Sequence, residues 1–261
     1  MTKVTYMSDL HLEFDANVDP GEGDILVLAG DILVAKYLDP SLNDSMARSK
    51  RKGYMRFYEK TLENYKSVYY IHGNHEPYGM DIDYAKELTN TVLPKWYGGM
   101  YDSTIEGVCL LQSTLWTDMN KRNPLDMSRV GQGMNDFSLI QQDGKRFTTK
   151  DAADIFDEDL ATFKDILENN PKQKFLVVTH HAPSLKGGSE KHHGSALNHG
   201  YYSDLERFIL EHPQIKYWIH GHTHIQKEYM VGDCRVLSNA RGYKGYEDVA
   251  DTFEPRSFTL D

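Results

Sequence analysis

The sequence predicts an α/β layered sandwich with a mixed sheet arrangement. Short apolar runs typical of strands alternate with helical patterns, and the C-terminal part of the chain is rich in strand signals. The 261 residues contain no internal repeat, low-complexity tract or linker, which favours a single domain over residues 1–261. The expected strands cover residues 3–9, 24–31, 67–74, 107–114, 174–181 and 216–222.

The clearest helical pattern lies in residues 149–170. Phe156, Leu160, Phe163 and Leu167 recur at spacings of four, three and four, which places them in one apolar stripe along a helix. Nearer the C-terminus, two apolar runs flank a Gly-Asp pair and predict a β-hairpin with a two-residue turn. Further helices are expected at residues 45–66, 82–92 and 203–211.

Composition and charge restrict the classes of function. Mean hydropathy is −0.60, and no segment approaches the roughly 20 apolar residues that a membrane helix needs. The N-terminal stretch carries acids where a signal peptide would be apolar, so we expect a soluble, cytoplasmic protein without membrane contact. The net charge of −10 repels phosphate backbones, so duplex nucleic acid is not an expected partner. Cys109 and Cys234 lie in apolar runs and predict buried free thiols.

Polar residues gather at the ends of five of the expected strands. Loops at the carboxyl ends of strands in α/β sheets converge on one crevice, so the clusters are expected to meet there. Residues i and i+2 of an extended segment point the same way, as in the Asp-x-His and His-x-His pairs of two clusters. The clusters are Asp9 and His11, Asp31, Asn74 to Glu76, His180 and His181, and His220 to His224.

Two carboxylates, an amide oxygen and several imidazoles in one crevice indicate hydrolysis of a phosphate ester. That reaction needs charge neutralised on the nonbridging oxygens and a hydroxide near neutral pH, and two cations about 3.5–4 Å apart provide both. Mixed His, Asp and Asn ligands favour Mn²⁺, Fe or Zn²⁺ over Mg²⁺ or Ca²⁺. We therefore expect two divalent ions, Mn²⁺ first, with Fe, Zn²⁺ or Ni²⁺ as alternatives.

The same residues resemble the motifs of the calcineurin-like metallophosphoesterases. That family carries, in order, D-x-H, G-D, G-N-H-[DE], a strand-end H and G-H-x-H. The sequence matches all five in that order, each after an expected strand and together spanning residues 9–224. The matching residues are Asp9-Leu10-His11, Gly30-Asp31, Gly73-Asn74-His75-Glu76, His180 and Gly221-His222-Thr223-His224.

The resemblance implies a four-layer αββα sandwich with two mixed β-sheets and a centre of two metals bridged by one aspartate. In the implied mechanism, a hydroxide shared by the metals attacks phosphorus in line. The implied ligands are Asp9, His11, Asp31 and His224 for one metal, and Asp31, Asn74, His180 and His222 for the other.

The resemblance also implies that the catalytic residues are Asp31, as the bridge, and His75. His75 would lie beside the metals as a non-ligand and protonate the leaving oxygen or stabilise the phosphate. Glu76 would orient the loop by hydrogen bonding. His181 either touches the substrate or packs in the interior. The turn with Asn239 and Arg241 resembles the family's N-x-R-G-Y turn, which implies that these two residues help to build the substrate rim.

Two segments of poor periodicity are expected to decide the substrate. Residues 116–147, which include Asp136, form either a lid or cap over the site or a surface excursion packed on the sandwich. Residues 184–200 are rich in Gly and Ser, and form either a loop that grips a phosphate or a solvated loop. The cationic candidates in this second segment are Lys186, Lys191, His192, His193 and His199.

The expected activity is hydrolysis of a phosphate monoester or diester of a small nucleotide or a similar substrate. Residues 30–36 lack the arginine-bearing continuation by which the protein phosphatases of the family bind phosphate, which argues against that activity. The alternatives are a noncatalytic binding module on the same scaffold, a nuclease acting on single-stranded nucleic acid, and a metal-dependent amide hydrolase. Retention of His75 and Asp31 argues against the first, and the initial D-x-H, in place of H-x-H, argues against the last.

Overall fold

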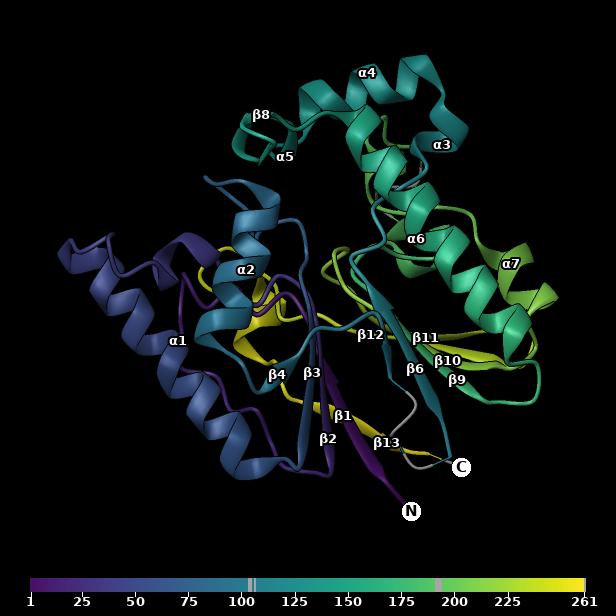
Figure 1. The fold of residues 1–261 in the computed structure, drawn as a ribbon, viewed down its shortest axis with the longest axis horizontal. Helices are drawn as coiled ribbons and strands as arrows, with labels where there is room; N and C mark the ends of the chain where they lie inside the picture. The colour runs from purple at the N-terminus through teal and green to yellow at the C-terminus, as the bar shows by residue number, and fades with distance from the viewer. Residues whose placement is uncertain (103–104, 106, 191–193, 261) are drawn as a thin grey trace.

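Two large β-sheets pack face to face in the computed structural model, which describes residues 1–102, 105, 107–190 and 194–260 (Figure 1). The first sheet has the order β13-β1-β2-β3-β4, formed by β1 Lys3–Met7, β2 Ile25–Ala29, β3 Ser67–Ile71, β4 Trp96–Tyr97 and β13 Arg256–Thr259. The second has the order β11-β12-β10-β9-β6-β5, formed by β5 Tyr101–Asp102, β6 Cys109–Ser113, β9 Phe175–Thr179, β10 Ile215–His220, β11 Gln226–Val231 and β12 Cys234–Asn239.

Both sheets are mixed, as expected. In the first sheet, β1 to β4 pair in parallel and β13 is antiparallel to β1. In the second, β6, β9, β10 and β12 pair in parallel, and β5 and β11 are antiparallel edge strands. The predicted hairpin is confirmed as β11 and β12, joined at Gly232 and Asp233.

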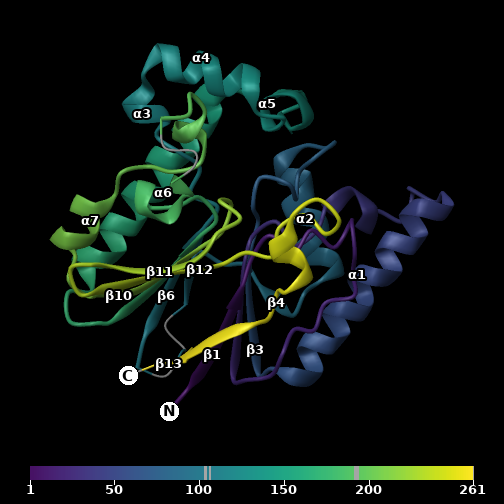
Figure 2. The same ribbon diagram turned by 180° about the vertical axis from the view of Figure 1, so that it is seen from behind.

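Helices cover the two outer faces, which confirms the four-layer αββα sandwich. In Figures 1 and 2, α1 Ser45–Asn64 and α2 Ile82–Val92 lie over the first sheet, and α6 Thr149–Asn169 and α7 Glu206–Glu211 over the second. The predicted helix at residues 203–211 begins later, at Glu206, because the N–H of Ser203 donates outside the helix, to the carbonyl of Ala182. Short 3₁₀ helices lie at η1 Ala35–Leu38, η2 Leu185–Gly187, η4 Asn198–Gly200 and η5 Asp248–Asp251.

Alternating side chains of the strands fill separate layers of the core. In β2, Ile25 and Val27 face the space between the sheets, whereas Leu26 and Leu28 pack beneath α1 and α2. Cys109 is buried and free in the core of the second sheet, as is Cys234, which confirms the prediction for both. Within the described residues, no helix is long and apolar enough to cross a membrane.

Residues 116–147, here called the cap, lie above the carboxyl ends of the strands in Figure 1. Val130, Phe137 and Phe147 of the cap belong to the same hydrophobic cluster as buried side chains of α6 and of the second sheet. Arg122 also binds Asp154 of α6, with its Nη1 2.8 Å from Oδ1. The elements of the cap are α3 Met119–Arg122, α4 Pro124–Gly133, α5 Asp136–Leu139, β7 Gln141–Gln142 and β8 Lys145–Arg146.

Candidate metal centre

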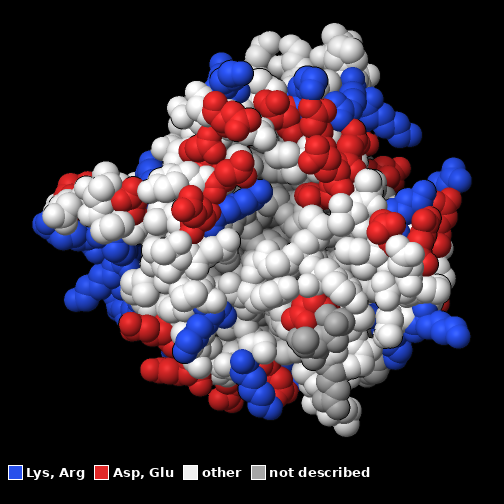
Figure 3. Space-filling model, viewed as in Figure 1, with Lys and Arg blue, Asp and Glu red and all other residues white. Residues whose placement is uncertain are grey.

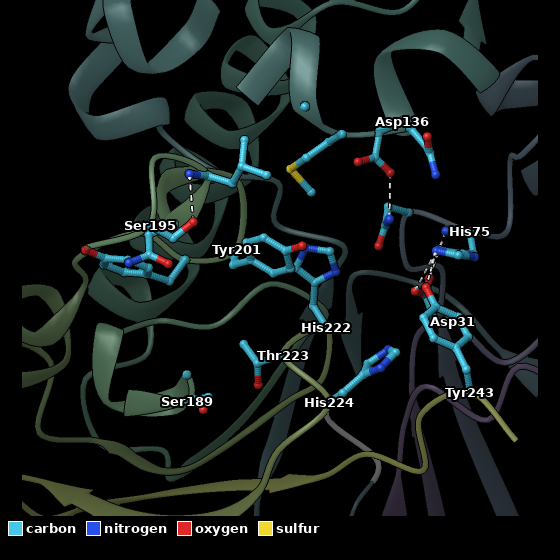
Figure 4. Close-up of a pocket in the computed structure, with 18 of the residues that line it drawn as sticks. Asp31, His75, Asp136, Ser189, Ser195, Tyr201, His222, Thr223, His224 and Tyr243 are labelled. Carbon is cyan, nitrogen blue, oxygen red and sulfur yellow. Dashed lines mark hydrogen bonds and ion pairs between the residues drawn. The ribbon is translucent and has the colours of Figure 1, made fainter. Parts of the chain in front are cut away.

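The loops that follow β2, β3, β9 and β10 meet at a cavity of about 470 Å³, and the loop that follows β1 brings Asp9 and His11 close to His224 beside it. In Figure 4, Asp31, His75, His222 and His224 lie together on one side of this cavity. Asn74 also lines it. The structure therefore brings together side chains that are up to 215 residues apart in the sequence, from Asp9 to His224 (224 − 9 = 215).

One group of expected ligands consists of Asp9, His11 and His224, whose ligand atoms lie within 4.8 Å of one another. Nε2 of His11 lies 3.3 Å from Nε2 of His224. The Nδ1 atoms of these rings are 3.1 Å and 2.7 Å from the carboxylates of Glu13 and Glu247, respectively, which accept the Nδ1 protons. In the neutral rings both Nε2 lone pairs therefore face each other, an arrangement that a shared cation stabilises.

The second group consists of Asp31, His180 and His222, with Asn74 beside it. Nδ1 of His180 donates to the carbonyl of Ala29 at 2.9 Å, so Nε2 faces inward, 2.9 Å from Oδ1 of Asn74. Nε2 of His222 is buried and has no hydrogen-bond partner among the described residues. A buried acceptor costs free energy unless it is paired, and a metal ion is a partner that this donor set fits.

Asp31 faces both groups with one carboxylate oxygen. Its Oδ2 lies 3.8 Å from Nε2 of His11 and 3.4 Å from Nε2 of His180. Although burial raises the pKa of Asp31, the His180 and His75 imidazoles hold it well below 3.8. Although burial lowers the pKa of His180, the Asp31 carboxylate raises it to about 10. The buried carboxylate thus attracts positive charge into the space between the two groups.

Several of the expected ligands have a left-handed backbone conformation, which residues other than glycine rarely adopt. Their φ values lie between 45° and 67°. Such residues cost about 1–3 kcal/mol each and persist at functional sites where the surrounding structure holds them. Five ligands in this conformation are therefore an independent indication of a functional site. They are Asp9, His11, Asp31, His222 and His224.

Glu76 holds the loop that carries Asn74 and His75. Its carboxylate accepts backbone N–H bonds from Asp31 at 3.0 Å, Ile32 at 2.8 Å and Gly73 at 2.7 Å. These bonds tie the loop after β3 to the loop after β2, and the expectation that Glu76 orients this region is confirmed. A glycine is required at position 73, because a Cβ there would lie 2.2 Å from Oδ1 of Asp31.

His75 lies at the edge of the centre and faces the cavity. Its ring stacks on Tyr78 with centroids 4.1 Å apart, and its Nε2 is 3.1 Å from the hydroxyl of Tyr243. Burial lowers the pKa of His75, against the opposing effect of the Asp31 carboxylate. His75 also forms a possible ligand group with His11 and Asp31, so its role as a non-ligand stays a prediction.

Asn239 and Arg241 do not line the cavity, which corrects the expectation that they build the substrate rim, and His181 adopts the second of its two expected roles, packing in the interior. Arg241 is 3% exposed, and its guanidinium donates inward to the carbonyl of Leu10 at 3.0 Å and to Oδ2 of Asp15 at 2.6 Å. Asn239 is 1% exposed and donates to two backbone carbonyls. His181 is buried between Trp116 and His222, with ring centroids 5.1 Å and 4.3 Å away. All three are framework residues.

The cavity is lined instead by Tyr243 and by side chains of the two segments that were expected to decide the substrate. Tyr243 lies two residues after Arg241, on the turn that was noticed, but only the fold shows which side chain faces inward. Lys186 pairs with Glu206 at 2.9 Å, and Lys191, His192 and His193 lie outside the described residues. The cap and the described residues of the segment after β9 supply the far wall, with Met134, Asn135, Asp136, Ser189, Ser195, Asn198, Tyr201 and Tyr202.

Comparison with known proteins identifies the class. A profile of the calcineurin-like phosphoesterase family matches residues 2–226. The chain therefore belongs to this family and is a metal-dependent phosphoesterase. A curated relative, an uncharacterised protein of Acanthamoeba polyphaga mimivirus, is 24% identical over 280 residues, covering 93% of this chain and 92% of that one.

Solved structures share the fold. The phosphopantetheinyl hydrolase of Mycobacterium tuberculosis is similar with a TM-score of 0.65 and 14% identity, covering 99% of this chain and 96% of that chain. A putative 5′-nucleotidase of Staphylococcus aureus is similar with a TM-score of 0.52 and 13% identity, covering 100% of this chain and 56% of that one. At these identities the likeness concerns the fold.

Proposed function

We propose that this protein hydrolyses a phosphate ester of a small molecule with two divalent metal ions, bridged by Asp31. The observation that carries the proposal is the position of Oδ2 of Asp31, which faces His11 of one ligand group and His180 of the other at 3.8 Å and 3.4 Å. The ions, when bound, would neutralise the phosphate and activate a water molecule as nucleophile. Mn²⁺ as the native metal and a cytoplasmic location remain predictions.

The surrounding residues would orient the ester and handle the leaving group. His75 lies on the cavity wall within hydrogen-bond reach of Tyr243, and its imidazole would hold or donate the proton that the leaving oxygen takes up. Glu13 and Glu247 would keep the Nε2 lone pairs of His11 and His224 directed inward.

The cavity favours a small ester whose charge lies at the metals. Its volume of about 470 Å³ suits a nucleotide-sized molecule. Of the lining residues within the described chain, none is Lys or Arg, so a single negative charge, as in a diester, is favoured over the double charge of a monoester. Acidic side chains gather over α6 in Figure 3, which disfavours a long polyanion on this face.

A substrate panel tests the proposal. The purified protein is stripped with chelator, reloaded with Mn²⁺ and assayed on bis-p-nitrophenyl phosphate, p-nitrophenyl phosphate, cyclic nucleotides and a phosphopantetheinyl diester. We expect activity only with metal, and a preference for the diesters. Metal-independent turnover would contradict the proposal. Tight binding of these esters without turnover would support the noncatalytic binding module.

A further inference from the structure

The amide of Asn74 can present either its oxygen or its nitrogen to the second ligand group, and only the oxygen can bind a metal. The two ends have nearly the same size, so hydrogen bonds decide which one faces inward. Oδ1 of Asn74 lies 2.9 Å from Nε2 of His180, on the side of the ligand group. Nδ2 points away and donates to Oδ1 of Asp136 at 2.6 Å.

Asp136 can enforce this orientation, whereas the other partner of Asn74 cannot. The hydroxyl of Tyr78 lies 3.3 Å from Nδ2 of Asn74 and 2.9 Å from Oδ1 of Asp136. A hydroxyl donates or accepts, so Tyr78 alone would be compatible with both orientations of the amide. Oδ1 of Asp136 accepts from both Nδ2 of Asn74 and the Tyr78 hydroxyl, and an accepting oxygen pairs with the amide nitrogen and not with the amide oxygen.

Asp136 is held in place by the cap. It is the first residue of α5, is 1% exposed and enters the cavity from the cap side in Figure 4. The next residue, Phe137, stacks on Phe147 with an interplanar angle of 8°. The backbone N–H of Gly79, in the loop that follows Asn74, donates to the carbonyl of Leu139 at 2.9 Å. The stacking holds α5 in place within the cap, and the Gly79 bond ties the cap to the Asn74 loop.

We propose that Asp136 is a positioning residue that turns the oxygen of Asn74 toward the second metal, so the cap forms part of the metal centre. The inference rests on the proposed function, because it takes Asn74 as a ligand. In this inference the cap orients a metal ligand, a role that differs from that of a lid closing over the substrate. Loss of Asp136 would weaken one metal position and leave the position of Asp9, His11 and His224 intact.

Calorimetric titration of the metal-free full-length protein with Mn²⁺ tests this directly. Asp136→Leu should weaken one of two Mn²⁺ sites by about 10- to 100-fold, the usual effect of removing the partner of a ligand. Asp136→Asn retains an acceptor oxygen and nearly the same shape, so its affinity for Mn²⁺ at the weakened site should lie between those of Asp136→Leu and the wild type. Raising the Mn²⁺ concentration should restore kcat in both variants.

Two controls separate positioning from general loosening of the cap. Tyr78→Phe keeps the bond between Asp136 and Asn74, so both Mn²⁺ affinities should stay within about twofold of wild type, well below the effect of a lost ligand partner. Arg122→Gln removes the ion pairs of the cap with Asp154 and Asp157 of α6 without touching Asn74, and should likewise leave both Mn²⁺ affinities within about twofold of wild type. A loss in Arg122→Gln equal to that in Asp136→Leu would overturn the inference, since loosening alone would then explain it.

Asn74→Ala distinguishes failure of the inference from failure of the proposed function. If Asn74→Ala loses one Mn²⁺ site while both Asp136 variants keep two wild-type affinities, the positioning role is wrong and the metal centre stands. If Asn74→Ala binds two Mn²⁺ ions as the wild type does, Asn74 is not a ligand, and both the proposed ligand set and the inference are overturned.

Discussion

Asp31 contributes to every part of the candidate centre. Its Oδ2 faces His11 and His180, and its Oδ1 accepts the backbone N–H of His75 at 2.8 Å. Asp31→Asn keeps an acceptor oxygen for that N–H, removes the charge and puts an NH₂ group in place of the other oxygen. We therefore expect the loop to stay in place while both Mn²⁺ ions are lost and turnover is abolished. Metal content after dialysis and the initial rate measure this, and a variant that retains two tightly bound ions would exclude Asp31 as the bridge.

His75 is predicted to act on the substrate and to leave the metals unchanged. His75→Ala should keep two Mn²⁺ ions and lower kcat by roughly 10²- to 10⁴-fold, the usual effect of losing a general acid. Tyr243→Phe, which removes only the hydroxyl 3.1 Å from Nε2 of His75, should lower kcat less. Metal content and kcat, measured on the same preparations, show whether His75 acts on the substrate or binds a metal. Loss of a metal ion in His75→Ala would show that His75 is a ligand.

At the scale of elements, the sequence predicted the strands and helices whose buried residues form a recognisable apolar pattern. The strands were identified as short apolar runs, which are buried on both faces as in β2, and the long helices by the helical spacing of their apolar residues, as in α6. The short elements of the cap have too few residues to show a period. Asp136 and Tyr243 were not assigned contacts, because their partners Asn74 and His75 are 62 and 168 residues away in sequence. The prediction that Arg241 lies at the substrate rim was wrong, because a sequence motif does not show in which direction a side chain points.

Helix α6 carries a titratable group whose environment predicts a pH dependence of stability. Asp159 accepts a hydrogen bond from Ser113, and burial raises its pKa above 3.8. The folded protein therefore binds this proton more tightly than the unfolded chain does, and ionising the group costs stability as the pH rises through the raised pKa. Asp159→Asn keeps an acceptor for Ser113. Its Tm should exceed that of the wild type at pH 8, and the difference should disappear below pH 4. A lower Tm at pH 8 would contradict this.

At the scale of the whole molecule, the candidate centre joins the two sheets. Asp9, Asp31 and Asn74 follow strands of the first sheet, whereas His180 and His222 follow strands of the second. The sequence could place each ligand at a strand end, but it could not show which strands share a sheet, because strand order depends on pairing between distant segments. Each ligand group draws side chains from both sheets, so bound metal would clamp the carboxyl ends of the sheets together.

This arrangement predicts that metal stabilises the whole fold. A ligand that binds only the folded state at 100 times its Kd adds about 2.7 kcal/mol to the free energy of unfolding, which raises the Tm of a domain of this size by about 5–10 °C. We expect Mn²⁺ to raise the Tm of the chelator-treated protein by this amount and excess chelator to reverse it. Asp31→Asn should show little shift, because its sheets lack the shared ligand. A Tm that is unchanged between Mn²⁺ and chelator in the wild type would contradict a metal centre between the sheets.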